Sequence, residues 1–153
     1  MYKSTDIKST LAGVETLNTK LLVFIATTNE SRGALITYLT NILGLTRTNL
    51  SLMLATRLAA VSNTQRPIEV RQALQELSDN GANAGPLLLV NIELMFDPSL
   101  QINPLEIVRS LARSKPVVMV WPGELRGDRL VYADMSHPEH RDYSRDGVVV
   151  LEI

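Results

Sequence analysis

The sequence predicts a single α/β domain in which helices flank a parallel sheet. Three observations carry this prediction: continuous apolar runs of strand length, amphipathic stretches between them, and the composition of a globular protein. Of 153 residues, 45% are hydrophobic and 20% are charged, as in a globular protein. A chain of this length can form one domain with its own core but is too short for two. One domain therefore spans residues 1–153, with residues 1–20 as an N-terminal helical lead-in.

Continuous apolar runs such as "LLVFIA" and "PVVMVW" indicate strands that are buried on both faces of a sheet. The run "PLLLVNIELMF" is similar but ends in mixed polar chemistry. Two further runs near the C-terminus, "RLVYA" and "GVVVLEI", are shorter or less regular. Strands are predicted at residues 21–26, 86–96, 116–121, 129–133 and 147–153.

The stretches between these runs place apolar residues three or four apart, which predicts helices. Gly44 suits the end of the second helix, and Asn103 with Pro104 suits the start of the last one. Helices are predicted at residues 6–19, at 33–44, at 50–61, from Pro67 to the break "DNGANAG", and at 103–115.

The composition also excludes several classes of function. The chain has no cysteine, which excludes disulfides, thiol catalysis and sulfur-ligated metals. No apolar run approaches the roughly 20 residues of a membrane span, and the N-terminus lacks the apolar region of a signal peptide. The net charge of −1 does not demand a polyanionic partner. We expect a soluble cytoplasmic protein without a membrane partner.

The segment "ATTNESRG" at 26–33 links the first strand to its helix, and it fits the spacing of a phosphate-binding loop, G-x-x-x-x-G-K-[ST]. The defining residues differ: alanine and serine replace the glycines, Arg32 replaces the lysine, and Gly33 replaces the hydroxyl that would bind magnesium. Glu30 adds a negative charge. From the residues alone, a turn without nucleotide duty is favoured. The candidate cofactor-binding residues are Asn29, Glu30, Ser31, Arg32 and Gly33.

The run at 86–96 is the candidate for the second nucleotide-binding strand, the Walker B strand. Such a strand ends in an acidic magnesium ligand, but Val90 stands at that position. Asn91 and Glu93 follow. From the residues alone, this is a buried strand with a polar tip.

Three other features have plain structural interpretations. The motif "HPEH" at 137–140 lacks the spacing of a zinc helix and a third ligand, so no metal site is predicted. Trp121 ends an apolar strand and is expected in the core. Arg109 and Arg113 share a helical face, which we interpret as solvated, although contact with phosphates or a partner stays an alternative.

The segments "NIELMFDPSLQINPLEIVRSLARSKPVVMVWPGEL" and "LVYADMSHPEHRDY" resemble BrxF, the short P-loop-containing family of type 3 BREX phage-defence systems. The resemblance extends from about Leu21 to Tyr143 and is most specific at residues 91–143, which include a W-x-G motif. It implies a P-loop NTPase fold related to the AAA+ and RecA-like group.

The resemblance also assigns positions to single residues. Arg32 takes the place of the Walker A lysine and Val90 that of the Walker B aspartate. Glu93 matches a glutamate of the family and is the candidate for orienting water, with a structural contact as the alternative role. Pro122 stands where a polar sensor would contact the γ-phosphate. By analogy with the fold, Arg141 is the candidate for an arginine that acts on a neighbour's nucleotide.

The departures fall where nucleotide chemistry would be carried out. We therefore expect an accessory subunit of a BREX system, a degenerate P-loop protein without a bound cofactor that acts as an interaction or assembly module. Its expected partners are other BREX proteins and further copies of itself. One alternative is an oligomeric AAA+ ATPase that uses ATP and magnesium through Arg32, Glu93 and Arg141. A second alternative is a DNA-binding module that acts through its arginines.

Overall fold

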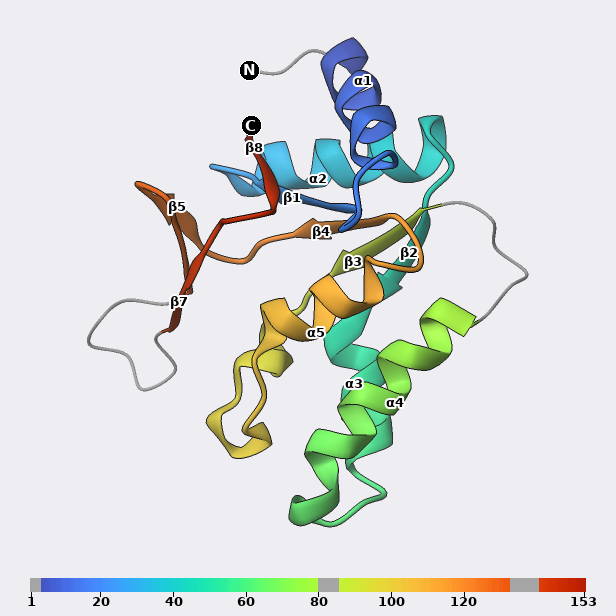
Figure 1. Ribbon diagram of the computed structural model, residues 1–153, viewed down its shortest axis with the longest axis vertical. Coiled ribbons are helices and arrows are strands. Elements are labelled where there is room, and N and C mark those ends of the chain that lie inside the picture. The colour runs from blue at the N-terminus through green and yellow to red at the C-terminus, as the bar shows by residue number, and fades with distance from the viewer. Residues whose placement is uncertain (1–3, 80–85, 133–140) are drawn as a thin grey trace.

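The computed structural model describes residues 4–79, 86–132 and 141–153, in which helices cover both faces of a five-stranded sheet (Figure 1). A small antiparallel sheet lies beside the large one. The helices are α1 (Ser4–Val14), α2 (Asn29–Thr37), α3 (Leu50–Leu58), α4 (Arg66–Asp79) and α5 (Pro104–Leu111). The strands are β1 (Leu21–Ile25), β2 (Thr46–Asn49), β3 (Leu87–Val90), β4 (Val117–Val120), β5 (Glu124–Arg126), β6 (Arg129–Tyr132), β7 (Arg141–Ser144) and β8 (Val149–Glu152).

The large sheet has the order β2-β3-β4-β1-β8, and all of its pairs are parallel. Leu22 in the central strand β1 lies opposite Val118 in β4 and opposite Val149 in β8. All five residues of β1 are buried, as expected for a strand covered on both faces. The predicted α/β fold with a parallel sheet is confirmed.

Alternate residues of each strand belong to two different cores, because successive side chains point to opposite faces. Leu21, Val23 and Ile25 pack into the core under α3, α4 and α5. Leu22 and Phe24 pack into the core under α1 and α2. Figure 1 shows the same division, with α1 and α2 on one side of the sheet and α3, α4 and α5 on the other.

The strand predicted at residues 129–133 is confirmed, but it does not belong to the parallel sheet. This run contains β6, which pairs antiparallel with β5 and β7 in the small sheet and is not part of the parallel one. The reason is its distance along the chain, since a parallel crossover needs about a dozen residues or more and only residues 121–128 separate β4 from β6. The fifth place in the large sheet belongs to β2, a polar edge strand that the apolar pattern did not predict.

Several element ends also differ from the prediction. The helix expected at 33–44 begins at Asn29, and it ends in a π-helical turn, Tyr38–Ile42. Gly44 follows with φ of 72°, so its predicted role at the end of this helix is confirmed. The run at 86–96 is a strand only over Leu87–Val90, and Glu93–Phe96 forms a 3-10 helix, η3.

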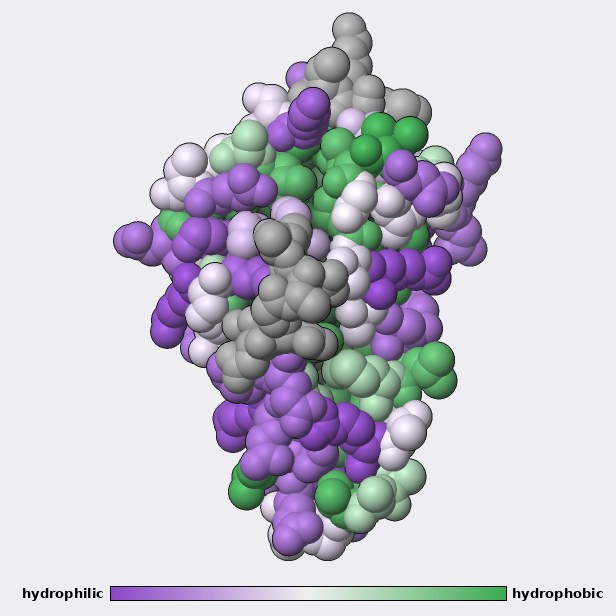
Figure 2. Space-filling view, turned by 90° about the vertical axis from the view of Figure 1, so that its right-hand side faces the viewer, coloured by the Kyte–Doolittle hydropathy of each residue, from purple (hydrophilic) through white to green (hydrophobic). Residues whose placement is uncertain are grey.

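The α3–α4 hairpin is held by one arginine on its polar face. Arg57 donates from Nε to Glu69 Oε1 at 2.7 Å and from Nη1 to Glu76 Oε2 at 2.6 Å. These hydrogen bonds, first to Glu76 and then to Glu69, raise the pKa of Arg57 above its usual value. Figure 2 shows mostly hydrophilic side chains over the lower half of the molecule, where α4 lies.

Candidate nucleotide site at the carboxyl edge of the sheet

The carboxyl ends of the five parallel strands lie along one edge of the large sheet, and open α/β sheets bind their ligands at such an edge. Four segments meet there: the turn after β1, the polar residues after β3, Trp121 after β4, and Ile153 after β8. The predicted nucleotide-binding residues belong to the first two segments.

The turn after β1 consists of three residues, Ala26 to Thr28, because α2 begins at Asn29. Thr28 caps the helix: its Oγ1 accepts a hydrogen bond from the Ser31 amide at 3.0 Å and donates one to Ser31 Oγ at 2.9 Å. Thr27 donates from its amide and its hydroxyl to the carbonyl of Ile153, at 3.0 and 3.1 Å. The turn is therefore short, capped and tied to the strand beside it.

The predicted phosphate-loop residues 29–33 lie in the first turns of α2. No residue of 26–33 has positive φ, so the backbone there follows an ordinary helix start. Arg32 is half-buried, and its Nε is buried without a hydrogen-bond partner in the structure. Glu30 and Gly33 are exposed. This arrangement offers one guanidinium beside a helix N-terminus whose amide at Ser31 is already used by Thr28.

The polar tip of β3 makes contacts within the fold. Val90, at the position of the expected acidic ligand, is 1% exposed and belongs to the core under α1 and α2. Asn91 adopts φ of 52°, which asparagine tolerates better than most residues, and its carbonyl accepts from the Ser51 amide at 2.8 Å. Ser51 Oγ in turn accepts from the Leu94 amide at 3.1 Å. These contacts join the end of β3 to the start of α3.

The two candidate catalytic residues lie on different parts of the edge. Glu93 is half-buried and opens η3 directly after β3. Because β4 lies between β1 and β3, the turn that precedes Arg32 and the strand that precedes Glu93 are about 10 Å apart. Arg141 begins β7 in the small sheet, where its backbone pairs with Tyr132. Among the described residues, no group of three or more His, Asp or Glu could hold a metal, and "HPEH" lies outside them.

An aromatic cluster lies beyond the carboxyl end of β4. Trp121 is fully buried, which confirms its predicted place in the core, and its Nε1 donates to the Val131 carbonyl of β6 at 3.0 Å. Phe96 of η3 stacks on Tyr132 with ring centroids 4.0 Å apart and meets Trp121 edge-on at 5.3 Å. Tyr143 of β7 completes the cluster, edge-on to Trp121 at 5.9 Å. These four rings, the aromatic cluster, join the small sheet to the large one.

Gly123 allows this close approach. A Cβ at this position would lie 1.9 Å from the Val131 carbonyl oxygen and 2.9 Å from Trp121 Nε1. The W-x-G motif therefore has a structural role here, since its tryptophan and its glycine both contact the backbone of β6. No pattern in the sequence pointed to Phe96, Tyr132 and Tyr143, because they come from three separate elements.

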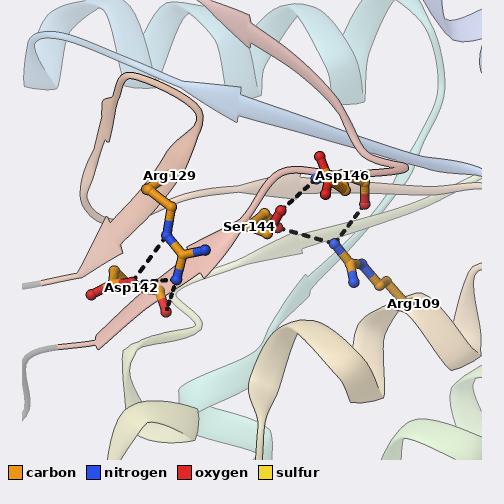
Figure 3. Close-up of polar contacts among 5 residues, drawn as sticks. All are labelled: Arg109, Arg129, Asp142, Ser144 and Asp146. Atoms are coloured by element: carbon orange, nitrogen blue, oxygen red, sulfur yellow. Dashed lines mark hydrogen bonds and ion pairs between the residues drawn. The ribbon is translucent and has the colours of Figure 1, made fainter.

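A second joint lies between α5 and the chain from β7 to β8 (Figure 3). Arg109 Nη2 donates to the carbonyls of Ser144 at 3.1 Å and Asp146 at 2.8 Å. Its side chain is only 23% exposed, so its interpretation as part of a solvated face is wrong. Arg129 and Asp142 form an ion pair at the other side of a hollow of about 240 Å³. Arg113, the other residue of the expected face, is exposed.

No helix among the described residues is long and apolar enough to cross a membrane. In comparisons with known proteins, no family model, no curated protein and no solved structure matches this chain.

Proposed function

We propose that this chain is a P-loop-type domain that neither binds nor hydrolyses nucleotide and that serves as an assembly module of a BREX-like phage-defence complex. The observation that carries the proposal is the short, capped turn after β1, together with the buried Val90 at the position of the acidic ligand. The strand order supports the choice of a P-loop-type fold, and the resemblance of residues 91–143 supports the choice of a BREX-like system.

The strand order favours the P-loop type over other α/β types. In the two common doubly wound orders, 3-2-1-4-5-6 and 2-1-3-4-5, the first strand lies next to the second. Here β1 lies between β4 and β8, and β2 is at the far edge. Counted along the chain within this sheet, the fourth strand is inserted between the first and the third, which is the order of AAA+ and RecA-like proteins. This is an argument from the fold and does not by itself assign an activity.

The carboxyl edge lacks the features that hold a triphosphate. A phosphate-binding loop directs several backbone amides at the phosphates, with a lysine and a magnesium ligand beside them. Here three residues join β1 to α2, and Thr28 occupies the Ser31 amide. The position of the acidic magnesium ligand is Val90, which is buried in the core. Without a magnesium ligand, the main means of neutralising the charge of ATP is lost.

The strand next to β1 ends in a residue of the core. Trp121 directly follows β4, the strand next to β1, and it is fully buried. Its ring packs into the core under α3, α4 and α5, on the face of the sheet opposite α2. Its only polar side-chain group, Nε1, already donates to the Val131 carbonyl, so the end of β4 offers no free side-chain group to a ligand.

The assignment to a BREX-like system rests on the resemblance of residues 91–143. This span includes η3, α5 and the strands from β4 to β6, together with the start of β7. The W-x-G motif within this span forms a contact between the two sheets. The resemblance therefore includes residues that join the two sheets. This supports a fold shared with the BrxF family and a role in assembly.

Calorimetric titration of the chain with millimolar Mg–ATP tests the proposal. We expect no saturable binding and no release of phosphate at any protein concentration. Arg32→Ala is the informative variant, and Arg113→Ala is its matched control because Arg113 is exposed on the segment after α5. Saturable binding with turnover that Arg32→Ala abolishes and Arg113→Ala leaves intact would overturn the proposal in favour of an ATPase.

A further inference from the structure

We propose that the free edge of β8 binds the β8 of a second copy, so that two sheets join into one across a twofold axis. This inference rests on the proposed assembly role and gives that role a partner. It is carried by three features of the described residues: a strand edge without a partner, an apolar hollow at one end of it, and an apolar residue at the other.

The outer edge of β8 offers backbone groups for pairing. β8 stands at the end of the large sheet, and β1 is its only strand neighbour among the described residues (Figure 1). The Ile153 amide donates to Ile25, and the Ile153 carbonyl accepts from Thr27, so both groups of Ile153 point to β1. Because these directions alternate along a strand, Val150 and Glu152 direct their amides and carbonyls outward. Such an edge is a template for another strand.

Antiparallel pairing about Val150 satisfies these outward groups. Val150 lies opposite its own copy and exchanges two hydrogen bonds with it. Glu152 lies opposite Val148, whose amide already donates to Arg145, so each Glu152 amide donates to a Val148 carbonyl. The pairing adds about four backbone hydrogen bonds without breaking any contact in the structure.

The hollow beside the edge selects the same register. It has a volume of about 430 Å³ and lies at the start of β8, where Leu17 is 42% exposed. The residues that line it are Leu17, Asn18, Thr19, Gly147, Val148 and Val149. In the pairing about Val150, Ile153 of each copy lies opposite Gly147 of the other, at this hollow.

The side chains also lie on the matching face. Val149 and Ile153 both pack against the core under α1 and α2. Residues directly opposite in a sheet point to the same face, and a twofold axis perpendicular to the sheet keeps that face. Each Ile153 therefore reaches the partner's hollow on the face to which Val149 points.

Charge complementarity supports a second copy as the occupant. Glu152 is exposed and lies opposite Val148 of the other chain. A tight turn closed by the hydrogen bond from Val148 to Arg145 brings Arg145 next to that position. Each dimer then contains two pairs of Glu152 with Arg145. The interface is small, so we expect a reversible dimer with modest affinity.

A charge exchange measured by sedimentation velocity tests this inference, with the full chain over a range of concentrations and without nucleotide. The wild-type chain should form a concentration-dependent dimer. Glu152→Arg alone and Arg145→Glu alone each place like charges opposite one another twice, and we expect each to dimerise about tenfold more weakly. An equal mixture of the two variants restores both pairs and should dimerise as the wild type does.

A second variant tests the hollow without touching the strand. Leu17→Arg at an exposed position should weaken the dimer, whereas Ile42→Arg, at a site that is 70% exposed and away from β8, should not. A monomeric wild type, a mixture that fails to restore dimerisation, or equal effects of Leu17→Arg and Ile42→Arg would each overturn the inference. A monomer would remove this interface, whereas nucleotide turnover in the calorimetric test would remove the assembly role itself, so the two failures are distinguishable.

Discussion

Replacing Gly123 with alanine should destabilise the joint between the two sheets. The added Cβ would lie 1.9 Å from the Val131 carbonyl oxygen, and the two must separate by about 1.5 Å to reach ordinary contact. The obstructing atom belongs to the backbone of β6, which is paired on both sides by β5 and β7. The strain therefore cannot be relieved by rotating a side chain.

The expected loss has two sources. Overpacking a well-packed site costs about 1–3 kcal/mol. Moving β6 away also lengthens the bond from Trp121 Nε1 to Val131, and a buried donor left without a partner costs about 1–3 kcal/mol. The two effects share one displacement and do not add fully, so we expect Gly123→Ala to lower the free energy of unfolding by about 2–4 kcal/mol.

Urea unfolding followed by fluorescence measures this loss, because Trp121 is the only tryptophan and lies at the joint. Gly33→Ala is the matched control. It lies inside α2, an added Cβ there meets no atom within 4 Å, and alanine should stabilise the helix by about 0.5–1 kcal/mol. If Gly123→Ala were as stable as the wild type, the close contact between the sheets and the structural role of the W-x-G motif would both be refuted.

Three further variants test other joints by thermal or urea unfolding. Thr28→Ala removes the cap of α2 and should cost about 1 kcal/mol, whereas Thr28→Asp should keep most of the stability, and equal losses would argue against the cap. Arg109→Met leaves two carbonyls without their donor and should cost about 2 kcal/mol, with partial recovery in Arg109→Lys; no loss in either would contradict the clamp. Arg57→Gln should cost less than about 1 kcal/mol because the pair with Glu76 is largely exposed. Since the pKa of Arg57 is raised, its contribution is complete below its unfolded pKa and is lost only at strongly alkaline pH, so this deficit should be the same from about pH 6 to pH 9.

The sequence predicted the parts of the fold that depend on apolar burial. Runs such as residues 21–26 and 116–121 have the length and the continuous apolar character of strands covered on both faces, and they contain β1 and β4. The apolar pattern did not predict β2, because its residues Thr46–Asn49 are polar. A polar strand is tolerated there because β2 is an edge strand with a neighbour on one side only. The sequence also did not show to which of the two sheets a strand belongs. An apolar strand such as β6 has the same sequence pattern in a parallel and in an antiparallel sheet.

The candidate site was predicted less well, for a different reason. The spacing of residues 26–33 fits a phosphate loop, but spacing does not determine where a helix begins. Thr28 caps the helix at Asn29, and no glycine at the required positions favours an open loop instead. The aromatic cluster was beyond prediction because its members are joined only by the docking of the small sheet.

Two independent observations support the same functional proposal. One concerns chemistry: the positions of the lysine, the hydroxyl and the acidic ligand hold Arg32, Gly33 and Val90. The other concerns the backbone, because Thr28 caps α2 through the Ser31 amide and Thr27 binds the carbonyl of Ile153. Restoring the missing side chains would address the first and not the second, since the turn would stay short and capped. The large sheet ends in two edge strands, β2 and β8, and we propose the edge of β8 as the one that binds a second copy.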